Sequence, residues 1–536
     1  MIKKIGILAA PALLSAILLR LSFPKPSLYP LAFIGFFPLF AALMKMERPR
    51  DGLFIGFIFG FIFYYSNIFW LNTLAYYNKF IYIGILLLGI YLGLFGALFG
   101  WLAVLLKKRV SKTALFFYPS LWVAIEYLRN IGQLSFPWSY ISASQAANLP
   151  FIQICSITGI WGVSFLLALA NTALAIAFLR IKERRKFSEI ISAPLWIAAV
   201  IALNHIYGIT RLYSKNEPTH PPLRAALIQT DIPQKIKYAG YAGTEDDTKN
   251  IPPQLESVNF EMLSKIETRG ADLVLFPESA VISPYFAYQK ELLNKLSKEA
   301  KRISAPILIG ANREVFFDEQ GRIVGPNDKI FAVNAYNSAW FIKKDGSLFQ
   351  QSYDKIHLVP FGEHLPYFDL IPGFQRIIVQ TGSFLKGVNY TLFPVESEGH
   401  QYHFGAVICF ESSFGWLFRK FTNRGADFLA IMTNDGWYEN SAGPFQHADL
   451  SIFRAIETGR YVLRCSNRGP SWIIKPNGQI AKTTSLNERC ILTGTIYPMK
   501  NKTIYAAIGD WLALPYFILP MLACYNHFKK RGKIKK

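Results

Sequence analysis

Three residues in the second half of the sequence carry side chains suited to covalent acyl chemistry. Glu278 follows the apolar run 273–277, Cys409 ends the run 405–408, and Lys355 lies among aromatic and apolar residues. A carboxylate can take the proton of a thiol, the thiolate is a nucleophile, and an ammonium group can stabilise an oxyanion. Together they predict a site that forms a covalent acyl intermediate.

Each of these residues also has a simpler interpretation. Cysteine is most often a packed core residue, although a strand-to-helix turn would place its thiol near backbone N–H groups that favour thiolate. Glu278 could be a partly desolvated base or a turn residue, and Lys355 could stabilise negative charge or pair with Asp354 at the surface. Glu363, after 359–362, is a candidate second carboxylate near the thiol.

The segments around these residues alternate between β-type apolar runs and amphipathic stretches. The predicted strands are 225–229, 273–276, 307–309, 339–342, 405–409, 428–432, 461–465, 472–474 and 492–496. The predicted helices are 254–267, 288–301, 416–423 and 445–459, and turn residues at 344–346 and 476–478 predict two hairpins. This alternation indicates an α/β layered fold with helices covering the sheets.

The first part of the chain is dominated by long apolar runs instead. A bilayer span needs roughly 20 apolar residues. Eight runs are candidate spans: 5–23, 28–44, 53–74, 81–106, 113–128, 151–179, 190–207 and 505–528. We therefore expect a seven-span membrane domain at 1–213, a catalytic domain at 214–503, and a final span with a basic tail at 504–536.

The charge distribution predicts how the chain crosses the membrane. Lys and Arg gather before the first span, after the second, fourth and sixth, and in the tail. The membrane part and the tail together contribute most of the formal net charge of +22. The positive-inside rule then places both termini in the cytoplasm and 214–503 on the extracytoplasmic face of the inner membrane. Because 208–503 nearly balance acidic and basic residues, the charge does not predict nucleic-acid binding.

Several apolar or buried features have two interpretations. The loop 135–140 could be the wall of a lipid-facing site or an aromatic interface belt. Glu126 could be functional, because acids within a membrane are costly, or could pair with Arg129. The stretches 285–288 and 365–374 could be arms that enter lipid or ordinary packed segments.

The cysteine and histidine patterns give no sign of a metal site. The five cysteines form no CxxC or Cys/His spacing, so we expect no metal and no cofactor. Cys465 and Cys490 are interpreted as buried strand residues, and His357, His364 and His447 as structural residues or neighbours of the site.

Taken together, the segments around Glu278, Lys355 and Cys409 resemble the carbon–nitrogen hydrolase (nitrilase) superfamily, whose catalytic Glu, Lys and Cys follow in this order. The resemblance covers most of 224–498 and extends to 336–337, 434–437, 443–447 and 454–457. It implies an αββα sandwich in which the Glu is the general base, the Lys supports the oxyanion and the Cys is acylated. It also implies supporting or substrate-binding roles for Glu363, Glu411, Phe410, Tyr238, Asn337 and Trp437.

The membrane spans narrow this resemblance to the apolipoprotein N-acyltransferase family. Residues 224–238 are similar to that family's first strand and loop, although Tyr238 stands where the family often has Trp and Phe410 where some members have Tyr. The resemblance implies a phospholipid acyl donor, a thioester on Cys409, and the α-amino group of a diacylglyceryl-apolipoprotein as acceptor. It implies that the lipid bilayer is a partner of the protein. Nothing in the sequence requires an oligomer, so we expect a monomer.

Two other functions remain open at this point. A membrane-tethered amidase or nitrilase that hydrolyses a C–N bond would use the same three residues, so they do not discriminate. A transporter or a sensor with a non-catalytic domain would be favoured by several charged residues inside the spans, where we find mainly Glu126.

Overall fold

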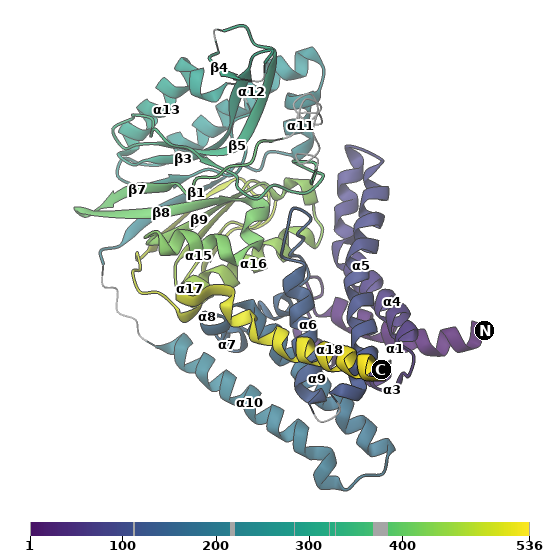
Figure 1. The fold of residues 1–536 in the computed structure, drawn as a ribbon. Coiled ribbons are helices and arrows are strands. Elements are labelled where there is room, and N and C mark those ends of the chain that lie inside the picture. Colours follow the sequence, from purple (N-terminus) through teal and green to yellow (C-terminus); the bar gives the residue numbers. More distant parts are fainter. Residues whose placement is uncertain are drawn as a thin grey trace.

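The computed structural model describes residues 2–110, 113–214, 220–282, 285–320, 322–326, 328–367 and 384–534. The chain first forms a helical part, then two stacked sheets with flanking helices, and returns to the helical part at its end (Figure 1). The predicted lipid-facing stretch 365–374 lies outside the described residues from 368 onward. The other predicted stretch contains the short helix η5 (Phe286–Tyr288), in which Phe286 is buried.

The helical part is built from long helices joined by short, tight helical turns. Its elements are α1 (Ile2–Leu21), η1 (Tyr29–Leu31), α2 (Ala32–Gly35), α3 (Phe37–Lys45), α4 (Pro49–Ile68), η2 (Phe69–Tyr76), α5 (Ile81–Leu106), η3 (Lys107–Arg109), α6 (Ala114–Leu128), η4 (Ile141–Gln145), α7 (Leu149–Ile152), α8 (Cys155–Thr158), α9 (Ile160–Lys182) and α10 (Phe187–Tyr213). After the sheets, α17 (Ile504–Ile508), η9 (Gly509–Ala513) and α18 (Pro515–Ile534) complete it.

Fewer helices reach full span length than the eight predicted. Among the described residues, five are long and apolar enough to cross a membrane: Pro49–Tyr76, Ile81–Arg109, Ile160–Lys182, Phe187–Tyr213 and Ile504–Lys529. The predicted spans 5–23, 28–44 and 113–128 correspond to shorter apolar helices. The predicted count of eight is therefore not confirmed.

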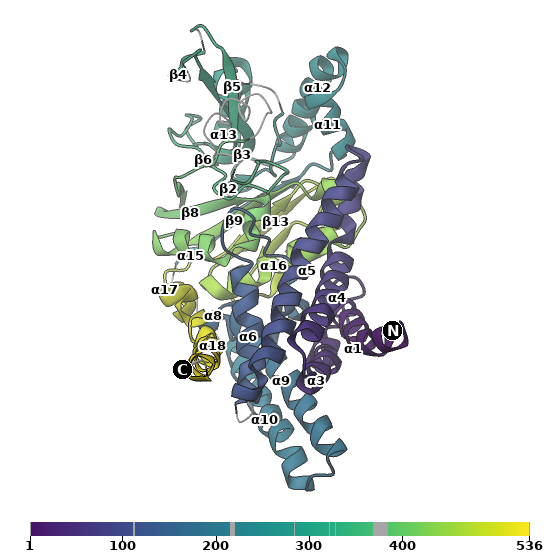
Figure 2. The same ribbon diagram turned by 45° about the vertical axis from the view of Figure 1, so that its right-hand side comes forward.

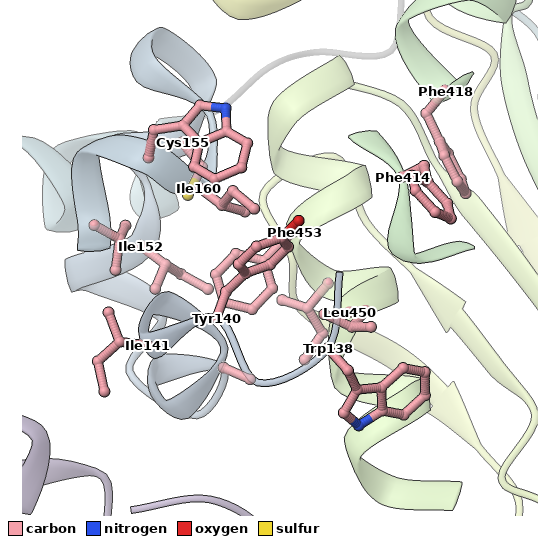
Figure 3. Packing of buried hydrophobic residues seen from close by; sticks show 14 of the residues in the cluster. Trp138, Tyr140, Ile141, Ile152, Cys155, Ile160, Phe414, Phe418, Leu450 and Phe453 are labelled. Carbon is pink, nitrogen blue, oxygen red and sulfur yellow. The ribbon is translucent and has the colours of Figure 1, made fainter. Parts of the chain in front are cut away.

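The predicted span 151–179 is wrong at its start. The helix is interrupted at Gly159, whose φ is +64°, and the long helix α9 begins only after it. A side chain at this position would meet the ring of Tyr505 at 2.5 Å, so only glycine fits the close approach. The short helix α8 before it, which begins at Cys155, packs on helix α16 (Gly443–Thr458) of the sheet-containing part instead. Figure 3 shows Cys155 and Ile160 on the helical side of this contact and Phe453 on the other.

Helices α4 and α5 pack backbone to backbone along a seam of glycines. A Cβ on Gly56 would lie 2.2 Å from the carbonyl oxygen of Gly96, and one on Gly52 would lie 2.4 Å from that of Gly100. Small residues allow such close packing of helices that share an apolar environment. This hairpin rises beside the sheets toward the helix α11 (Gln234–Ala242), as Figure 2 shows.

The two sheets contain the predicted strands and several more. The first has the order β13-β1-β2-β3-β5-β6, with β4 paired to β3, and the second has the order β12-β11-β10-β9-β8-β7. The strands of the first are β1 (Leu223–Gln229), β2 (Leu273–Leu275), β3 (Ile307–Phe317), β4 (Ile323–Val324), β5 (Ala332–Ile342), β6 (Tyr353–Asp354) and β13 (Cys490–Ile496). Those of the second are β7 (Leu392–Ser397), β8 (His400–Ile408), β9 (Phe428–Thr433), β10 (Val462–Ser466), β11 (Trp472–Ile474) and β12 (Ile480–Thr483).

Helices cover the outer faces of both sheets, which gives the predicted αββα sandwich (Figure 1). Helices α12 (Glu245–Ser264) and α13 (Lys290–Ile303) pack on the first sheet, and α15 (Gly415–Asn423) and α16 (Gly443–Thr458) on the second. Residues of β1 alternate accordingly: Leu227 faces the core between the sheets and Ile228 faces α12 and α13. The buried thiol of Cys465 lies 3.3 Å from the carbonyl oxygen of Leu275, so the two sheets meet closely there.

The main departures from the predicted elements have local causes. Strands β3 and β5 are much longer than 307–309 and 339–342, because an antiparallel ladder continues through polar residues such as Asn312 and Asn337. Helix α12 begins nine residues before the predicted 254, at Glu245, where a capping box joins Thr244 and Asp247. Both predicted hairpin turns are confirmed, by backbone hydrogen bonds from Lys343 to Ser347 and from Lys475 to Gln479.

The helical part and the sandwich share one hydrophobic core. Helix α16 packs on α8 and η4, and Phe410 lies beside Phe136, with Trp138, Tyr140 and Phe453 buried between the two parts (Figure 3). The candidate site lies next to this shared core, since Cys409 and Phe410 belong to the same cluster.

Candidate active site

The three candidate residues each follow a strand directly or closely. Glu278 lies three residues after β2, Lys355 directly after β6, and Cys409 directly after β8, where it opens the short helix η7 (Cys409–Ser413). Glu278 and Cys409 are 7% and 6% exposed, and Lys355 is fully buried. The alternative that Lys355 is a surface residue paired with Asp354 is therefore wrong: Asp354 instead pairs with Arg313 at 2.6 Å.

The carboxylate of Glu278 is held by three groups from separate elements. Its Oε1 accepts a hydrogen bond from Asn337 Nδ2 at 2.8 Å and lies 3.6 Å from Lys355 Nζ. Its Oε2 accepts from the backbone N–H of Asn434 at 3.1 Å. Asn337 also reaches Glu363 Oε1 at 3.4 Å, so it joins the two carboxylates.

Lys355 is charged because carboxylates surround it. Burial by itself lowers the pKa of Lys355, but Glu363, at 2.8 Å, and Glu278 raise it well above its usual value. Glu363 is fixed in turn, since its Oε2 accepts a hydrogen bond from the Val359 backbone at 2.9 Å. The site therefore contains a permanent buried cation, the group that a developing oxyanion requires.

Cys409 is a protonated thiol in the resting state. Burial and the nearby Glu278 raise the pKa of its thiol, and Lys355 only partly offsets them. Its backbone has a φ of +53°, in the left-handed region that non-glycine residues rarely adopt. Such strain at a single residue is typical of functional turns. A thiol in this state needs a base before it can attack, and Glu278 is the carboxylate beside it.

Glu411 joins the turn of Cys409 to the segment of Lys355. Its fully buried carboxylate accepts hydrogen bonds from the backbone of Ile408 at 2.8 Å and of Ile356 at 2.7 Å, and from the hydroxyl of Tyr353. Burial raises its pKa to about 7. Glu411 therefore joins the residue before Cys409 to the residue after Lys355 and orders the Cys409 turn.

A second buried network supports the turn from the other side. Nε2 of His447 lies 3.1 Å from the carbonyl oxygen of Cys409 and 2.8 Å from the hydroxyl of Ser412, and Nδ1 lies 2.7 Å from Asp435. Burial raises the pKa of Asp435, but Arg464 and His447 outweigh it and lower that pKa to about 2. His447 is thus a neighbour of the site, as predicted.

The remaining predicted residues face the helical part through their rings. The ring centroid of Tyr77, at the end of the α4–α5 hairpin, lies 4.9 Å from that of Tyr238 and 5.2 Å from that of Trp437. Phe410 lies 6.1 Å from Phe136 of the loop 135–140. The structure therefore brings Tyr238, Trp437 and Phe410 to the boundary between the two parts.

The loop 135–140 is packed on the site, which favours its interpretation as a wall over that of an interface belt. Ser135 Oγ lies 3.0 Å from His357 Nε2, two residues after Lys355. Glu126 stabilises the chain just after this loop, because its carboxylate accepts a hydrogen bond from the Ile141 backbone at 2.8 Å. Arg129 instead donates to the carbonyl oxygen of Trp138 at 3.0 Å.

Sequence reasoning missed two residues of this region. Gln446, on α16, receives hydrogen bonds from the indole groups of Trp70 at 3.0 Å and Trp138 at 2.9 Å, so it connects the helical part to the helix that carries His447. Lys237 lies buried beside the turn of Glu278. The motifs 443–447 and 232–238 contain them, but spacing alone does not show which residue of a motif points inward.

The comparisons with known proteins cover almost the whole chain. Residues 15–173 match the apolipoprotein N-acyltransferase N-terminal domain, and residues 224–500 match the carbon-nitrogen hydrolase family. A protein of Geobacter metallireducens named apolipoprotein N-acyltransferase is 30% identical over 94% of this chain and 92% of its own length. The chain belongs to the apolipoprotein N-acyltransferase family. A relative of the same name from Chlorobaculum tepidum is 30% identical over 93% of this chain and 92% of its own.

Membership in this family makes the protein a membrane acyltransferase with a nitrilase-like domain, as the resemblance in the sequence implied. It decides against the transporter or sensor and against the tethered amidase. Among solved structures, a CN-hydrolase superfamily protein from Xanthomonas campestris is similar over 52% of this chain and 91% of its own, with 19% identity and a TM-score of 0.35. That score is too low to bear on the site.

Proposed function

We propose that the protein transfers a fatty acyl chain from a membrane phospholipid to the α-amino group of the S-diacylglyceryl N-terminal cysteine of apolipoproteins. One observation supports this most directly: the buried Glu278–Lys355 pair, 3.6 Å apart, stands beside the strained turn of Cys409 at the boundary with the helical part. At this position, Cys409 can form a thioester with an acyl chain taken from a membrane lipid.

In the first half-reaction, Glu278 takes the thiol proton of Cys409 and the thiolate attacks an ester carbonyl of the phospholipid. Lys355 and the backbone N–H of Phe410 stabilise the tetrahedral oxyanion. When the intermediate collapses, the C–O bond to glycerol breaks and the leaving alkoxide receives the proton from Glu278. A lysophospholipid departs, and the acyl chain remains on Cys409 as a thioester.

In the second half-reaction, the neutral α-amino group of the acceptor attacks the thioester carbonyl. The same groups stabilise the oxyanion, and Glu278 removes the proton that the nitrogen loses. The C–S bond breaks, the thiolate regains a proton from Glu278, and the product is an amide. The cycle needs no group beyond the two substrates and the side chains of the site.

The supporting residues form two groups: some contact the three proposed catalytic residues or their turns, and others contact aromatic residues of the helical part. Glu363 keeps Lys355 charged, Asn337 orients Glu278, and Glu411 orders the turn of Cys409. Phe410, Tyr238 and Trp437 contact aromatic residues of the helical part, which suits walls for the acyl chain or for the lipid-modified acceptor.

The proposal extends to the placement of the enzyme. Residues 1–213 and 504–536 form the inner-membrane part with both termini in the cytoplasm, and residues 214–503 form the catalytic domain on the extracytoplasmic face, with a single chain as the working unit. Basic loops on one side of the helices support this orientation. Both lipid substrates would then meet the enzyme without leaving the bilayer.

A transfer assay tests the proposal. Purified enzyme in detergent is given phospholipid and a diacylglyceryl lipopeptide acceptor, and the N-acylated product is measured by mass spectrometry. Cys409→Ala and Glu278→Gln should lose transfer, whereas Cys490→Ala, a half-buried cysteine at the start of β13, should retain it. Transfer by the Cys409→Ala enzyme would refute the nucleophile, and release of free fatty acid without N-acylation would refute the acceptor.

A further inference from the structure

A buried lysine outside the three candidate residues contacts the turn that carries Glu278. Lys237, on α11, is 1% exposed, and its Nζ donates a hydrogen bond to the carbonyl oxygen of Ser279 at 3.0 Å. Lysine is almost never this buried without a specific partner. The partner here is the residue that follows the proposed base.

The turn of Glu278 needs such support because its backbone is strained and tightly packed. Ser279 has a φ of +48°, in the left-handed region. A Cβ on Gly310 of β3 would lie 2.9 Å from the Cα of Glu278, so glycine there allows the close approach. Asn259 of α12 donates to the carbonyl oxygen of Ala280 at 2.9 Å. Of the two side chains that donate to these backbone carbonyl oxygens, Lys237 is the charged one.

We propose that Lys237 is a positioning residue for the base: it fixes the turn through Ser279, and its positive charge keeps the carboxylate of Glu278 ionised and ready to take the thiol proton. The inference rests on the proposed role of Glu278. Two effects follow from one ammonium group, a geometric effect through the hydrogen bond and an electrostatic effect on the neighbouring carboxylate.

The electrostatic effect acts on both side chains, so it also appears in the pKa of Lys237. Burial lowers the pKa of Lys237 to about 8, and Glu278 opposes that decrease, so the two side chains interact and the lysine is mainly cationic near neutral pH. Several other groups face Glu278 from the elements around it. They are Lys355 and, beyond it, Glu363 on the segment after β6, Cys409 on η7, Tyr438 on the short helix η8 (Asp435–Tyr438), and Tyr241 on α11.

These neighbours make a second cation useful. Of the groups just named, only Lys355 carries positive charge, and Glu363 contacts it more closely than Glu278 does, at 2.8 Å against 3.6 Å. Lys355 is therefore shared between two carboxylates, and Lys237 adds positive charge beside the turn that carries Glu278. Removing that charge should make negative charge on Glu278 less favourable, because an opposite charge nearby favours the ionised form of a carboxyl group.

The experiment measures thioester formation on Cys409 from phospholipid, without acceptor, as a function of pH. The full-length enzyme in detergent is compared with Lys237→Met, Lys237→Arg and Glu278→Gln, after thermal unfolding confirms that each variant folds. Lys237→Met should acylate about 10-fold more slowly near pH 7, and the acidic limb of its profile of acylation rate against pH should move upward by about one pH unit. Lys237→Arg should restore the limb to its wild-type position.

Each outcome decides the inference. A slower Lys237→Met enzyme with an unmoved acidic limb overturns the electrostatic role, as does a variant identical to wild type. If the methionine variant does not fold, Lys237→Gln, which keeps a donor for Ser279 but no charge, carries the same test. If Glu278→Gln remains active, the proposed function of the base fails. If that variant is inactive while the limb of Lys237→Met stays in place, only the present inference fails.

Discussion

The ammonium group of Lys355 lies 3.6 Å from the carboxylate of Glu278, and both side chains are buried. The proposed base and the proposed oxyanion cation are thus in contact before any substrate arrives. Together with the closer contact to Glu363, this contact explains how a lysine remains charged without water around it, since burial alone favours the neutral amine. It also means that replacing either residue removes a charged partner from the other.

Lys355→Met should lower kcat for acyl transfer by about 10²–10³-fold, because loss of one oxyanion donor has that effect in enzymes that stabilise a tetrahedral intermediate. Initial rates with phospholipid and lipopeptide give the value. Lys344→Met, at an exposed hairpin turn, is the matched control and should keep wild-type rates. If the Lys355 variant retained more than a tenth of wild-type kcat, the proposed role of this residue would be wrong.

The stability of the protein should depend more on the hydrogen bonds that Gln446 accepts than on the charge at this position. Gln446→Leu leaves the buried indole N–H groups of Trp70 and Trp138 unpaired, at a cost of about 1–3 kcal/mol for each. Gln446→Glu keeps an acceptor for both. We expect the melting temperature in detergent to fall more for the leucine variant. The opposite order would show that this contact does not hold the two parts together.

The glycine seam between α4 and α5 predicts a position-specific effect in the membrane part. Gly56→Ala places a Cβ 2.2 Å from the carbonyl oxygen of Gly96, so the helices must separate and the folded yield should fall. Gly84→Ala, on α5, has no atom within 4 Å of the new Cβ and should be neutral or stabilising by up to about 1 kcal/mol. Size-exclusion chromatography of detergent extracts measures both. Equal yields for the two variants would contradict the packing.

Glu411 predicts a pH dependence of stability with a defined sign. Burial raises its pKa to about 7, from 4.5 in an exposed carboxyl, so the folded state binds this proton more tightly than the unfolded chain. Its contribution is therefore fully present below about pH 4.5 and is lost as the pH rises through 7, by an amount on the order of 3 kcal/mol. The melting temperature should fall less between pH 5 and 7.5 in Glu411→Gln than in wild type.

The glutamine variant also carries a constant cost, which separates the two effects. An amide offers one acceptor oxygen where the carboxylate has two, so the backbone N–H of Ile408 or of Ile356 loses its partner at every pH. We therefore expect lower stability at pH 5 together with the flatter pH profile. An unchanged slope would contradict the raised pKa.

The fold could be predicted where apolar runs were short and well bounded. The strands 428–432 and 472–474 were found nearly as they occur in β9 and β11, because both are continuous and buried. The prediction 405–409 captured only the buried end of β8, because the first residues of that strand are exposed or partly exposed. The lengths of β3 and β5 could not be found, since their outer halves alternate with polar residues and are stabilised by pairing with each other. The break at Gly159 was also hidden, because glycine is common within membrane helices.

Some residues of the candidate site could likewise be identified from the sequence, and others could not. Glu278, Lys355 and Cys409 could be chosen from residue type and from their positions after strands, and they do meet. Lys237 and Gln446 could not be chosen, because their importance depends on which face of α11 and α16 is buried and on partners more than 40 residues away in the sequence. Glu411 was selected, but only the structure shows that its partners are backbone groups of the protein.

The most direct test of the central claim is intact-protein mass spectrometry of the purified enzyme after incubation with a phospholipid of defined acyl chains and no acceptor. The account predicts a mass increase of one acyl group, mapped to Cys409 by peptide analysis and removed by hydroxylamine, as expected for a thioester. It also predicts that the adduct disappears when a diacylglyceryl lipopeptide is added. No adduct at all, or an acyl group on another residue that the lipopeptide does not remove, would contradict Cys409 as the acyl carrier.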